Sequence, residues 1–342
     1  RVRYPLIANL YSSIAMSSKL SQLFFKFSPI YKNVTWGGTE IFRFKDIPEE
    51  GSCVGESWEI SGVKEHESIV DGGNDNGMIL SELVAKYKGS LVGDKNYATY
   101  GNKFPLLIKF IDARNTLSVQ VHPNEQLAQE RHNCSGKSEM WYIIHAEDDA
   151  KMYIGLSQTL SHEEYDRHVN EKSLLNVIEQ HTPRAGNSYY IPAGRVHSIG
   201  AGILLLEVQQ ASDITYRIYD FDRKDINGNL RELHTELAKE AIDLNVNEDC
   251  ICVPESLNDS EERLVKCPYF DVKKIDIDGE FEIEQNDNFT IAVCVEGELQ
   301  LTATGAGLTD STTLRCGFST LIAASATNIK VTGTGKLITV TT

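Results

Sequence analysis

The sequence predicts an all-β protein that is decorated with helices and divided into a larger and a smaller β domain. Short apolar or alternating stretches recur along the chain, bounded by Gly, Pro, Asn, Asp or Ser, which is the pattern of strands and turns. In the last third, strands and glycine turns follow one another at regular spacing, as in a β-sandwich or barrel. Helical spacing of apolar residues occurs only in a few short windows.

The larger domain is expected over residues 16–244. Its strands are expected within a β-rich stretch at 27–70 and then at 106–111, 116–122, 140–144, 189–191, 203–208 and 214–219. Helices are expected at 78–91, 124–132 and 233–244, with a short helical insertion at about 157–182. Pro123 ends the strand before it because proline lacks the N–H group that a strand ladder needs.

The remaining segments differ in composition. Residues 245–266 are rich in Asn, Asp, Glu and Ser, which predicts a linker. Residues 267–342 contain period-2 strands separated by glycine turns, which predicts a smaller C-terminal β domain. Residues 1–15 precede a more natural beginning at Met16, and we expect them to be a leader that is not native.

Composition excludes several classes of partner. The 342 residues include 33 Lys and Arg against 49 Asp and Glu, a formal net charge of −16. This balance argues against nucleic-acid and anionic-membrane partners, which are bound by clustered cations. No apolar run reaches the about 18 residues that a transmembrane helix needs. The 7 cysteines are odd in number and form no CxxC pair, so a cytoplasmic location is expected. The oligomeric state is not indicated.

Two pairs of alternating polar residues are candidate ligands. Gln120 and His122 lie two positions apart on a predicted strand and therefore share one face. Lys137 and Glu139, just before the next predicted strand, share a face in the same way. Taken alone, all four are better explained as solvated residues on an open sheet face.

The stretch 186–197 strengthens the metal interpretation. Its spacing, G-x5-P-x-G-x2-H, predicts a strand, a tight turn and a second strand whose first inward residue is His197, although a core histidine is an alternative. The spacing resembles the second motif of the cupin superfamily of metal-binding barrels. Together with Gln120, His122 and Glu139, His197 gives a donor set of two imidazoles, one carboxylate and one amide. This set suits catalytic zinc. Mn, Fe or Co could compete for the same donors.

Over roughly residues 27–240 the chain resembles the short bacterial form of type I mannose-6-phosphate isomerase (phosphomannose isomerase). The resemblance rests on stretches that follow one another in family order: 36–38 (WGG), 55–60 (GESWEI), 105–109 (PLLIK), 117–123 (LSVQVHP), 136–142 (GKSEMWY), 191–197 (IPAGRVH) and 207–220 (EVQQASDITYRIYD). It implies a catalytic cupin barrel, with the C-terminal domain as a degenerate second cupin. The chain differs from the long eukaryotic form of the family: it shows only one short helical insertion and no large helical domain.

The resemblance also implies a site. One Zn²⁺ per chain is expected on Gln120, His122, Glu139 and His197. The family's essential arginine falls on Arg217, a pocket lysine and aspartate fall on Lys137 and Asp213, and a second lysine falls on Lys109. The implied reaction interconverts mannose 6-phosphate and fructose 6-phosphate through an enediolate, so a small phosphorylated sugar is the expected partner.

Roles for these residues follow from their chemistry. Arg217 is expected to contact the substrate oxygens, and on a predicted strand it shares a face with Asp213, which would orient it. Lys109, Lys137 and Arg217 are expected to bind substrate. Lys137 and Asp213 are candidate proton-transfer groups, beside Glu139 and a zinc-bound hydroxide. Arg195 and Arg223 are further cations available for the phosphate.

Two other functions remain alternatives. A metal-dependent cupin oxygenase would need a redox metal with open positions for O₂, and the amide ligand with its nearby cations argues against it. A non-catalytic sugar-phosphate-binding cupin would carry the same ligands without turnover.

Overall fold

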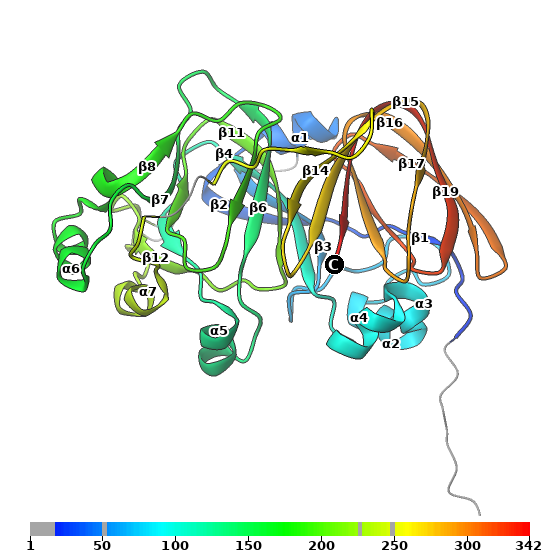
Figure 1. The fold of residues 1–342 in the computed structure, drawn as a ribbon, viewed down its shortest axis with the longest axis horizontal. Coiled ribbons are helices and arrows are strands. Elements are labelled where there is room, and N and C mark those ends of the chain that lie inside the picture. The colour runs from blue at the N-terminus through cyan, green and yellow to red at the C-terminus, as the bar shows by residue number, and fades with distance from the viewer. Residues whose placement is uncertain (1–17, 50–52, 225–227, 247–249) are drawn as a thin grey trace, which may run out of the picture.

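The computed structural model describes residues 18–342 apart from 50–52, 225–227 and 247–249. The expected leader at 1–15 lies outside the described residues. The described chain consists mainly of antiparallel strands in several sheets, with short helices at the edges, so the predicted all-β fold is confirmed (Figure 1). The division into domains stays a prediction.

Two antiparallel sheets build the N-terminal part. The six-stranded sheet has the order β2-β3-β4-β11-β6-β9 and the five-stranded sheet the order β12-β5-β10-β7-β8. The first contains β2 (Ile30–Gly38), β3 (Val54–Ser61), β4 (Leu106–Ala113), β11 (Ile203–Gln210), β6 (Glu139–Ala146) and β9 (Ser188–Ile191). The second contains β12 (Tyr216–Tyr219), β5 (Val119–Val121), β10 (His197–Ile199), β7 (Met152–Leu156) and β8 (Ile178–His181).

An apolar cluster shared by both sheets holds them face to face. Ile111 of β4, Trp141 of β6 and Leu205 of β11 pack with Ile154 of β7 and Ile199 of β10. Side chains on a strand alternate between the two faces of the sheet. The inner face of β11 therefore continues from Leu205 to residues 207 and 209, where the apolar core gives way to polar side chains.

The outer face of the six-stranded sheet packs against the C-terminal sheet. Ile108 of β4 and Leu206 of β11 belong to the same buried cluster as Val272, Val293 and Ile338. One continuous core thus joins the two parts, which lie side by side in Figure 1.

The C-terminal sheet has eight strands in the order β1-β18-β16-β19-β15-β14-β13, with β17 paired to β16. They are β1 (Phe24–Phe25), β13 (Glu255–Ser256), β14 (Glu261–Lys266), β15 (Asp271–Ile283), β16 (Thr290–Gly305), β17 (Leu308–Arg315), β18 (Ser319–Ile322) and β19 (Ala326–Thr341). Three strands come from outside the predicted C-terminal domain. β1 pairs with β18. β13 and β14 lie inside the segment expected as a linker, where they pair with each other, and β14 pairs with β15.

The helices are short and lie at the edges of the sheets (Figure 1). They are α1 (Glu40–Lys45), α2 (Leu80–Tyr87), α3 (Gly89–Val92), α4 (Asp94–Tyr100), α5 (Glu125–His132), α6 (His162–Asn170), the 3₁₀ helix η1 (Leu174–Val177) and α7 (Thr235–Ala241). The helix expected at 78–91 is divided into α2 and α3 at Lys88, whose φ of 50° interrupts helical geometry. The insertion at 157–182 contains α6 and η1 but also strand β8.

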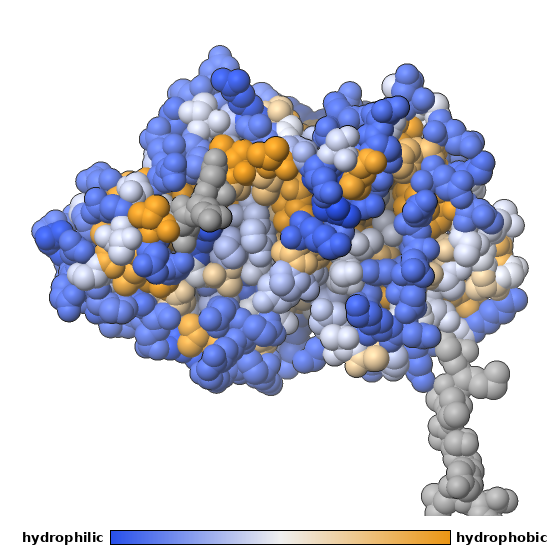
Figure 2. All heavy atoms as spheres, in the orientation of Figure 1, coloured by the Kyte–Doolittle hydropathy of each residue, from blue (hydrophilic) through white to orange (hydrophobic). Residues whose placement is uncertain are grey.

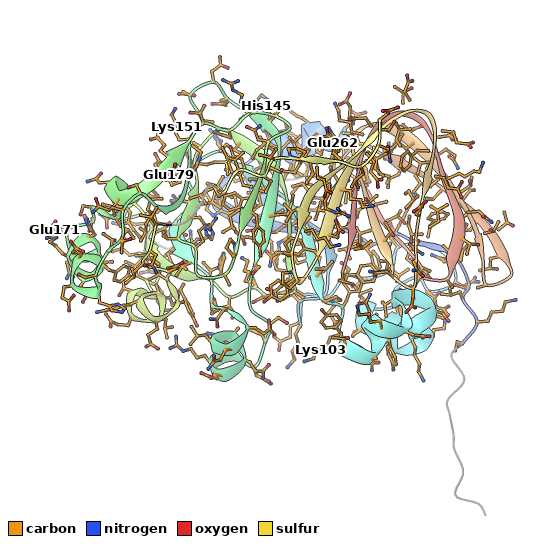
Figure 3. All side chains as sticks on the ribbon, viewed as in Figure 1. Lys103, His145, Lys151, Glu171, Glu179 and Glu262 are labelled. Atoms are coloured by element: carbon orange, nitrogen blue, oxygen red, sulfur yellow. The ribbon has the colours of Figure 1, made fainter. Side chains whose placement is uncertain are left out.

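The surface and the interior contrast sharply in polarity. Hydrophilic residues cover most of the face drawn in Figure 2. Charged side chains such as Lys103, Glu171 and Glu179 are exposed and lie at the periphery in Figure 3. Within the described part of the chain, no helix is long and apolar enough to cross a membrane. Charged residues buried inside the N-terminal part are therefore the exceptions that need a chemical explanation.

Candidate active site

Strand register brings three of the expected site residues into one row. On the five-stranded sheet, Gln120 of β5 is paired with His197 of β10 on one side and with Arg217 of β12 on the other. Directly opposed residues of antiparallel strands place their side chains on the same face, with Cβ atoms about 4.5–5.5 Å apart. The predicted strand–turn–strand at 186–197 is confirmed, since β9 ends at Ile191 and β10 begins at His197.

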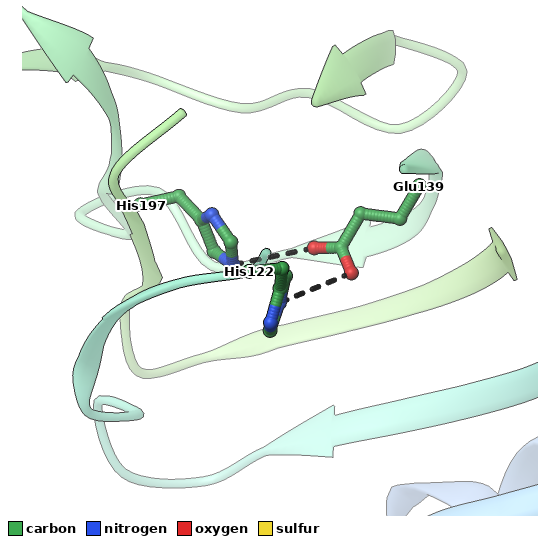
Figure 4. Close-up of side chains that lie close together, drawn as sticks. All are labelled: His122, Glu139 and His197. Atoms are coloured by element: carbon green, nitrogen blue, oxygen red, sulfur yellow. Dashed lines mark ion pairs between the residues drawn. The ribbon is translucent and has the colours of Figure 1, made fainter. Parts of the chain in front are cut away.

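His122, Glu139 and His197 converge between the two sheets (Figure 4). The Nε2 atom of His122 lies 3.4 Å from Oε2 of Glu139, and Nε2 of His197 lies 3.3 Å from Oε1 of the same carboxylate. All three side chains are buried, and their ligand atoms lie within 4.8 Å of one another. Among the residues that the structure describes, no other such cluster of His, Cys, Asp and Glu is found.

Backbone carbonyls fix the orientation of both imidazoles. Nδ1 of His122 donates to the carbonyl of Ile214 at 2.9 Å, and Nδ1 of His197 donates to that of Arg195 at 2.9 Å. A carbonyl can only accept, so each ring carries its proton on Nδ1 and turns the Nε2 lone pair toward Glu139. Metal-binding histidines normally donate a hydrogen bond in this way from the ring nitrogen that does not bind the metal.

Unpartnered buried atoms show that the cluster fits a cation. Nε2 of His122 and Oε2 of Glu139 are buried without a hydrogen-bond partner. Leaving such acceptors unpaired is costly, and a divalent cation between them would satisfy both. The two imidazoles and the carboxylate are a ligand set that zinc accepts, with room for further donors.

The fourth expected ligand lies next to the cluster. Nε2 of the Gln120 amide is 3.2 Å from Nε2 of His197, while its Oε1 accepts from Ser118 at 3.2 Å. An amide can be turned over without changing its shape. Turning it would present Oε1, the atom that binds metals, to the space that the cluster surrounds.

Electrostatics holds the ligands in the protonation states that a metal requires. Burial, followed by the positive charge of Lys137, lowers the pKa of His122 to about 3. Burial also lowers the pKa of His197. Burial acts to raise the pKa of Glu139, but His122 and His197, in their protonated forms at low pH, and the cation of Lys137 outweigh burial and hold that pKa below its usual range. Neutral imidazoles and an ionised carboxylate are the metal-binding forms.

A cavity of about 320 Å³ opens beside the cluster. Gln120 lines it together with four basic residues, Lys109, Lys137, Arg217 and Arg231. Three acidic residues, Glu56, Glu207 and Asp213, also line it. All the expected catalytic and substrate-binding residues therefore border one space next to the His122–Glu139–His197 cluster.

The charges on the six-stranded sheet are tightly paired. Lys109 and Glu207 face each other across β4 and β11, with Nζ 3.1 Å from Oε1, and Glu56 of β3 lies 3.5 Å from the same Nζ. Trp141 donates to Glu207 at 2.8 Å and Trp58 donates to Glu56 at 2.6 Å.

These pairings decide the protonation of Lys109. Burial would lower its pKa, but Glu207, Glu56 and Glu139 outweigh burial and raise it above its usual value. Burial and repulsion by Glu139 raise the pKa of Glu207. Lys109 is therefore a permanent cation next to the His122–Glu139–His197 cluster.

Arg217 and Asp213 share the cavity but not an ion pair. The expected Asp213–Arg217 pairing on one strand does not form within the described structure, because β12 begins only at Tyr216 and Asp213 precedes it. Arg217 instead donates from Nη1 to the carbonyl of Glu232 at 2.9 Å, and its Nε is buried without a partner. Lys137 is buried with Nζ 3.7 Å from Oε2 of Glu139.

Sequence reasoning missed three cavity residues and proposed two that lie elsewhere. Glu56, Glu207 and Arg231 were not singled out, although a glutamate inside the apolar strand at 203–208 is a signal of a buried charge. Arg195 and Arg223 are not among the cavity residues and bind the carbonyls of Tyr190 and Thr116.

A second hollow of about 500 Å³ borders Glu40, Asp112 and His145. Its buried carboxylate, Asp112, already accepts the backbone N–H of Glu40 at 2.7 Å and so supports the start of α1. We assign no ligand to this hollow.

Comparison with known proteins agrees with this geometry. The family model for the phosphomannose isomerase type I catalytic domain matches residues 24–138, and that for the mannose-6-phosphate isomerase cupin domain matches residues 260–342. The chain is 38% identical over 283 residues to mannose-6-phosphate isomerase ManA of Bacillus subtilis, covering 81% of this chain and 86% of that protein. It is 35% identical to the mannose-6-phosphate isomerase of Streptococcus mutans, covering 80% of this chain and 85% of that one.

Solved structures show the same fold. The crystal structure of mannose 6-phosphate isomerase from Bacillus subtilis superposes with a TM-score of 0.84 at 31% identity, covering 93% of this chain and 99% of that one. A putative mannosephosphate isomerase from Archaeoglobus fulgidus gives a TM-score of 0.76 at 23% identity, covering 94% and 98% of the two chains, which supports the fold alone. With relatives of such identity and coverage, this chain belongs to the type I mannose-6-phosphate isomerase family of cupin enzymes.

Proposed function

We propose that this mannose-6-phosphate isomerase is a zinc-dependent aldose–ketose isomerase, which interconverts mannose 6-phosphate and fructose 6-phosphate through an enediolate. The observation that carries the proposal is the convergence of His122, Glu139 and His197 beside a cavity lined by cations. The names of the Bacillus subtilis and Streptococcus mutans relatives support the same substrate. A cytoplasmic location stays a prediction.

Gln120, His122, Glu139 and His197 are the residues proposed to hold one Zn²⁺ per chain. When bound, the ion would polarise the sugar carbonyl and stabilise negative charge on the neighbouring oxygens. The protein contributes the rigid support: both imidazoles are fixed through Nδ1, and Trp141 packs edge-on against His197 with ring centroids 5.4 Å apart. A support of this kind holds ligands in place without reorganisation.

Arg217 is proposed to contact the oxygens on which charge develops. Register places it next to Gln120, and the hydrogen bond from Nη1 to Glu232 fixes the guanidinium while its buried Nε stays available as a donor. A guanidinium stays charged in this setting because its pKa lies far above neutrality. Substrate negative charge can therefore form next to a donor that is already oriented.

Lys137 and Asp213 are proposed as the proton-transfer groups between C1 and C2 of the sugar. Both line the cavity, but Lys137 is buried against Glu139, while Asp213 is exposed and precedes β12. Lys109 and Lys137, with Arg217, are also proposed to bind the sugar phosphate. Lys109 is held as a cation by Glu207 and Glu56, so its role is to donate hydrogen bonds and positive potential.

The test is a coupled assay that follows fructose 6-phosphate formed from mannose 6-phosphate. Activity should disappear after chelation and return on adding Zn²⁺ in stoichiometric amounts. Parallel additions of Mn²⁺, Co²⁺ and Fe²⁺ identify the metal that the site uses. A metal-loaded protein that binds the sugar phosphate but does not turn it over would contradict the proposal.

A further inference from the structure

The four basic residues of the cavity are not equally available to a ligand. Lys109 is surrounded by Glu207 at 3.1 Å and Glu56 at 3.5 Å, and Lys137 lies 3.7 Å from the metal-cluster residue Glu139. Both lysines are also almost fully buried, with side chains that are 6% and 5% exposed. Arg231 has a carboxylate at a similar distance, Asp220 at 3.5 Å, but its side chain is 26% exposed and so can be reached by a ligand in the cavity.

Asp220, a buried carboxylate, attracts Arg231 but accepts no hydrogen bond from it. Its Nη1 lies 3.5 Å from Oδ2 of Asp220, and Arg223 lies 3.9 Å from the other oxygen, Oδ1. Within the described structure neither oxygen of Asp220 has a hydrogen-bond partner. The carboxylate thus attracts two guanidinium groups while leaving the donors of Arg231 free to bind a further anion.

The segment that carries Arg231 is fastened to strand β12. The backbone N–H of His234 donates to the carbonyl of Arg217 at 2.7 Å, and the backbone N–H of Arg217 donates to Nδ1 of His234 at 3.2 Å. Nη1 of Arg217 donates to the carbonyl of Glu232 at 2.9 Å. These three bonds fix the position of Arg231 relative to Arg217 at the edge of the cavity.

An unpaired buried donor on the neighbouring arginine indicates an absent acceptor in the cavity. In the described structure, Nε of Arg217, which borders the same cavity, is buried and has no hydrogen-bond partner. A buried donor without an acceptor is unfavourable unless a ligand supplies one. A phosphoryl group carries acceptor oxygens and negative charge, and it matches the planar donor fork of arginine.

We propose that Arg231 binds the phosphoryl group of the sugar phosphate, and that Asp220 positions Arg231 for this contact. The proposal rests on the function proposed above and assigns one part of the substrate to one part of the cavity. It also separates two tasks: Lys137 and Arg217 act near the His122–Glu139–His197 cluster, and Arg231 anchors the charged end of the sugar.

The test compares Arg231→Ala and Arg231→Lys with the wild type in the metal-loaded enzyme. For Arg231→Ala, KM for mannose 6-phosphate and the inhibition constant of inorganic phosphate should both rise by about ten- to a hundredfold, the effect of losing one charged hydrogen-bonding contact. Turnover at saturation and the residual rate with unphosphorylated mannose should change little. Arg231→Lys should recover part of the phosphate affinity because it restores the charge without the planar fork.

Arg263→Ala is the matched control. The side chain of Arg263 is 23% exposed, against 26% for Arg231, and it is also paired with carboxylates, but it lies in the C-terminal sheet. Its removal should leave KM and the phosphate inhibition constant unchanged. Thermal unfolding and metal content of every variant separate a binding defect from a folding defect.

The possible failures are distinguishable. An active wild type whose KM and phosphate inhibition are unchanged in Arg231→Ala overturns the role of Arg231 and leaves the proposed function intact. A wild type without isomerase activity overturns the proposed function; phosphate binding measured by calorimetry, weakened in Arg231→Ala, would then still support an anion site at Arg231. Unchanged binding in that experiment would overturn both.

Discussion

Replacing Lys109 by methionine tests how much the buried ion pairs of Lys109 with Glu207 and Glu56 stabilise the folded protein. Its Nζ lies 3.1 Å from Glu207 and 3.5 Å from Glu56. At an effective dielectric constant of about 20, each contact is worth about 5 kcal/mol of Coulomb attraction. Part of this repays desolvation, and breaking a buried pair typically costs about 3–5 kcal/mol. We therefore expect Lys109→Met to lower the free energy of unfolding by about 3–5 kcal/mol at pH 7.

The loss should depend on pH with a defined sign. Without the lysine, burial and mutual repulsion should raise the pKa values of Glu56 and Glu207 in the folded variant above their unfolded values. The folded state then binds protons more tightly than the unfolded state, so stability is highest at low pH and falls as pH rises through the raised pKa values. The defect relative to wild type should thus be smaller at pH 5 than at pH 7.

Urea denaturation followed by tryptophan fluorescence measures the effect, since Trp58 and Trp141 donate to the same two carboxylates. Lys45→Met is the matched control. Lys45 is equally buried and lies 2.5 Å from Glu59, but it belongs to α1 and is not a cavity residue. Both variants should be destabilised, and only Lys109→Met should also lose isomerase activity. A destabilisation below about 1 kcal/mol, or one that is equal at pH 5 and pH 7, would refute the reasoning.

Three further outcomes are expected. Arg217→Ala should lower kcat by about 10²–10³, as does loss of one oxyanion donor, while the bound metal is retained; loss of metal in elemental analysis would contradict this. The chelated protein should lose stability as pH falls from about 6.5 to about 3. In this range His122 is already protonated in the unfolded chain but not in the folded protein, where its pKa is about 3, so protons favour the unfolded state. At about 1.4 kcal/mol per pKa unit this amounts to about 5 kcal/mol, and a flat profile in acid denaturation would exclude it. Trp141→Phe should keep an aromatic ring beside His197 but cost about 1–3 kcal/mol by removing the indole N–H that donates to Oε2 of Glu207, which thermal unfolding would measure.

Local patterns in the sequence, together with the family resemblance, were sufficient to find the residues of the candidate metal site. Gln120 and His122 follow strand periodicity, and the proline–glycine turn before His197 sets where the next strand begins. Gly194 has a φ of 91°, a conformation that glycine adopts at no steric cost. Because these signals lie within a few residues of each donor, the structure brings His122, Glu139 and His197 together as expected.

Features that depend on packing between distant strands were not predictable in the same way. Glu207 faces Lys109 only because β4 and β11 pair in one particular register. Arg231 reaches the cavity because its segment is bound to β12, a contact that no local pattern encodes. The polar segment at 245–266 likewise gains β14 from pairing with β15, which overrides its loop-like composition.

Metal content is the most direct measure of whether four distant donors hold one ion. Elemental analysis of the purified wild type should give close to one zinc per chain, with activity proportional to occupancy as the metal is removed and restored. His197→Ala should contain essentially no metal while its circular dichroism stays that of a folded β protein. A His197→Ala variant that keeps its zinc, or a wild type that is fully active after its metal has been removed, would contradict the assignment.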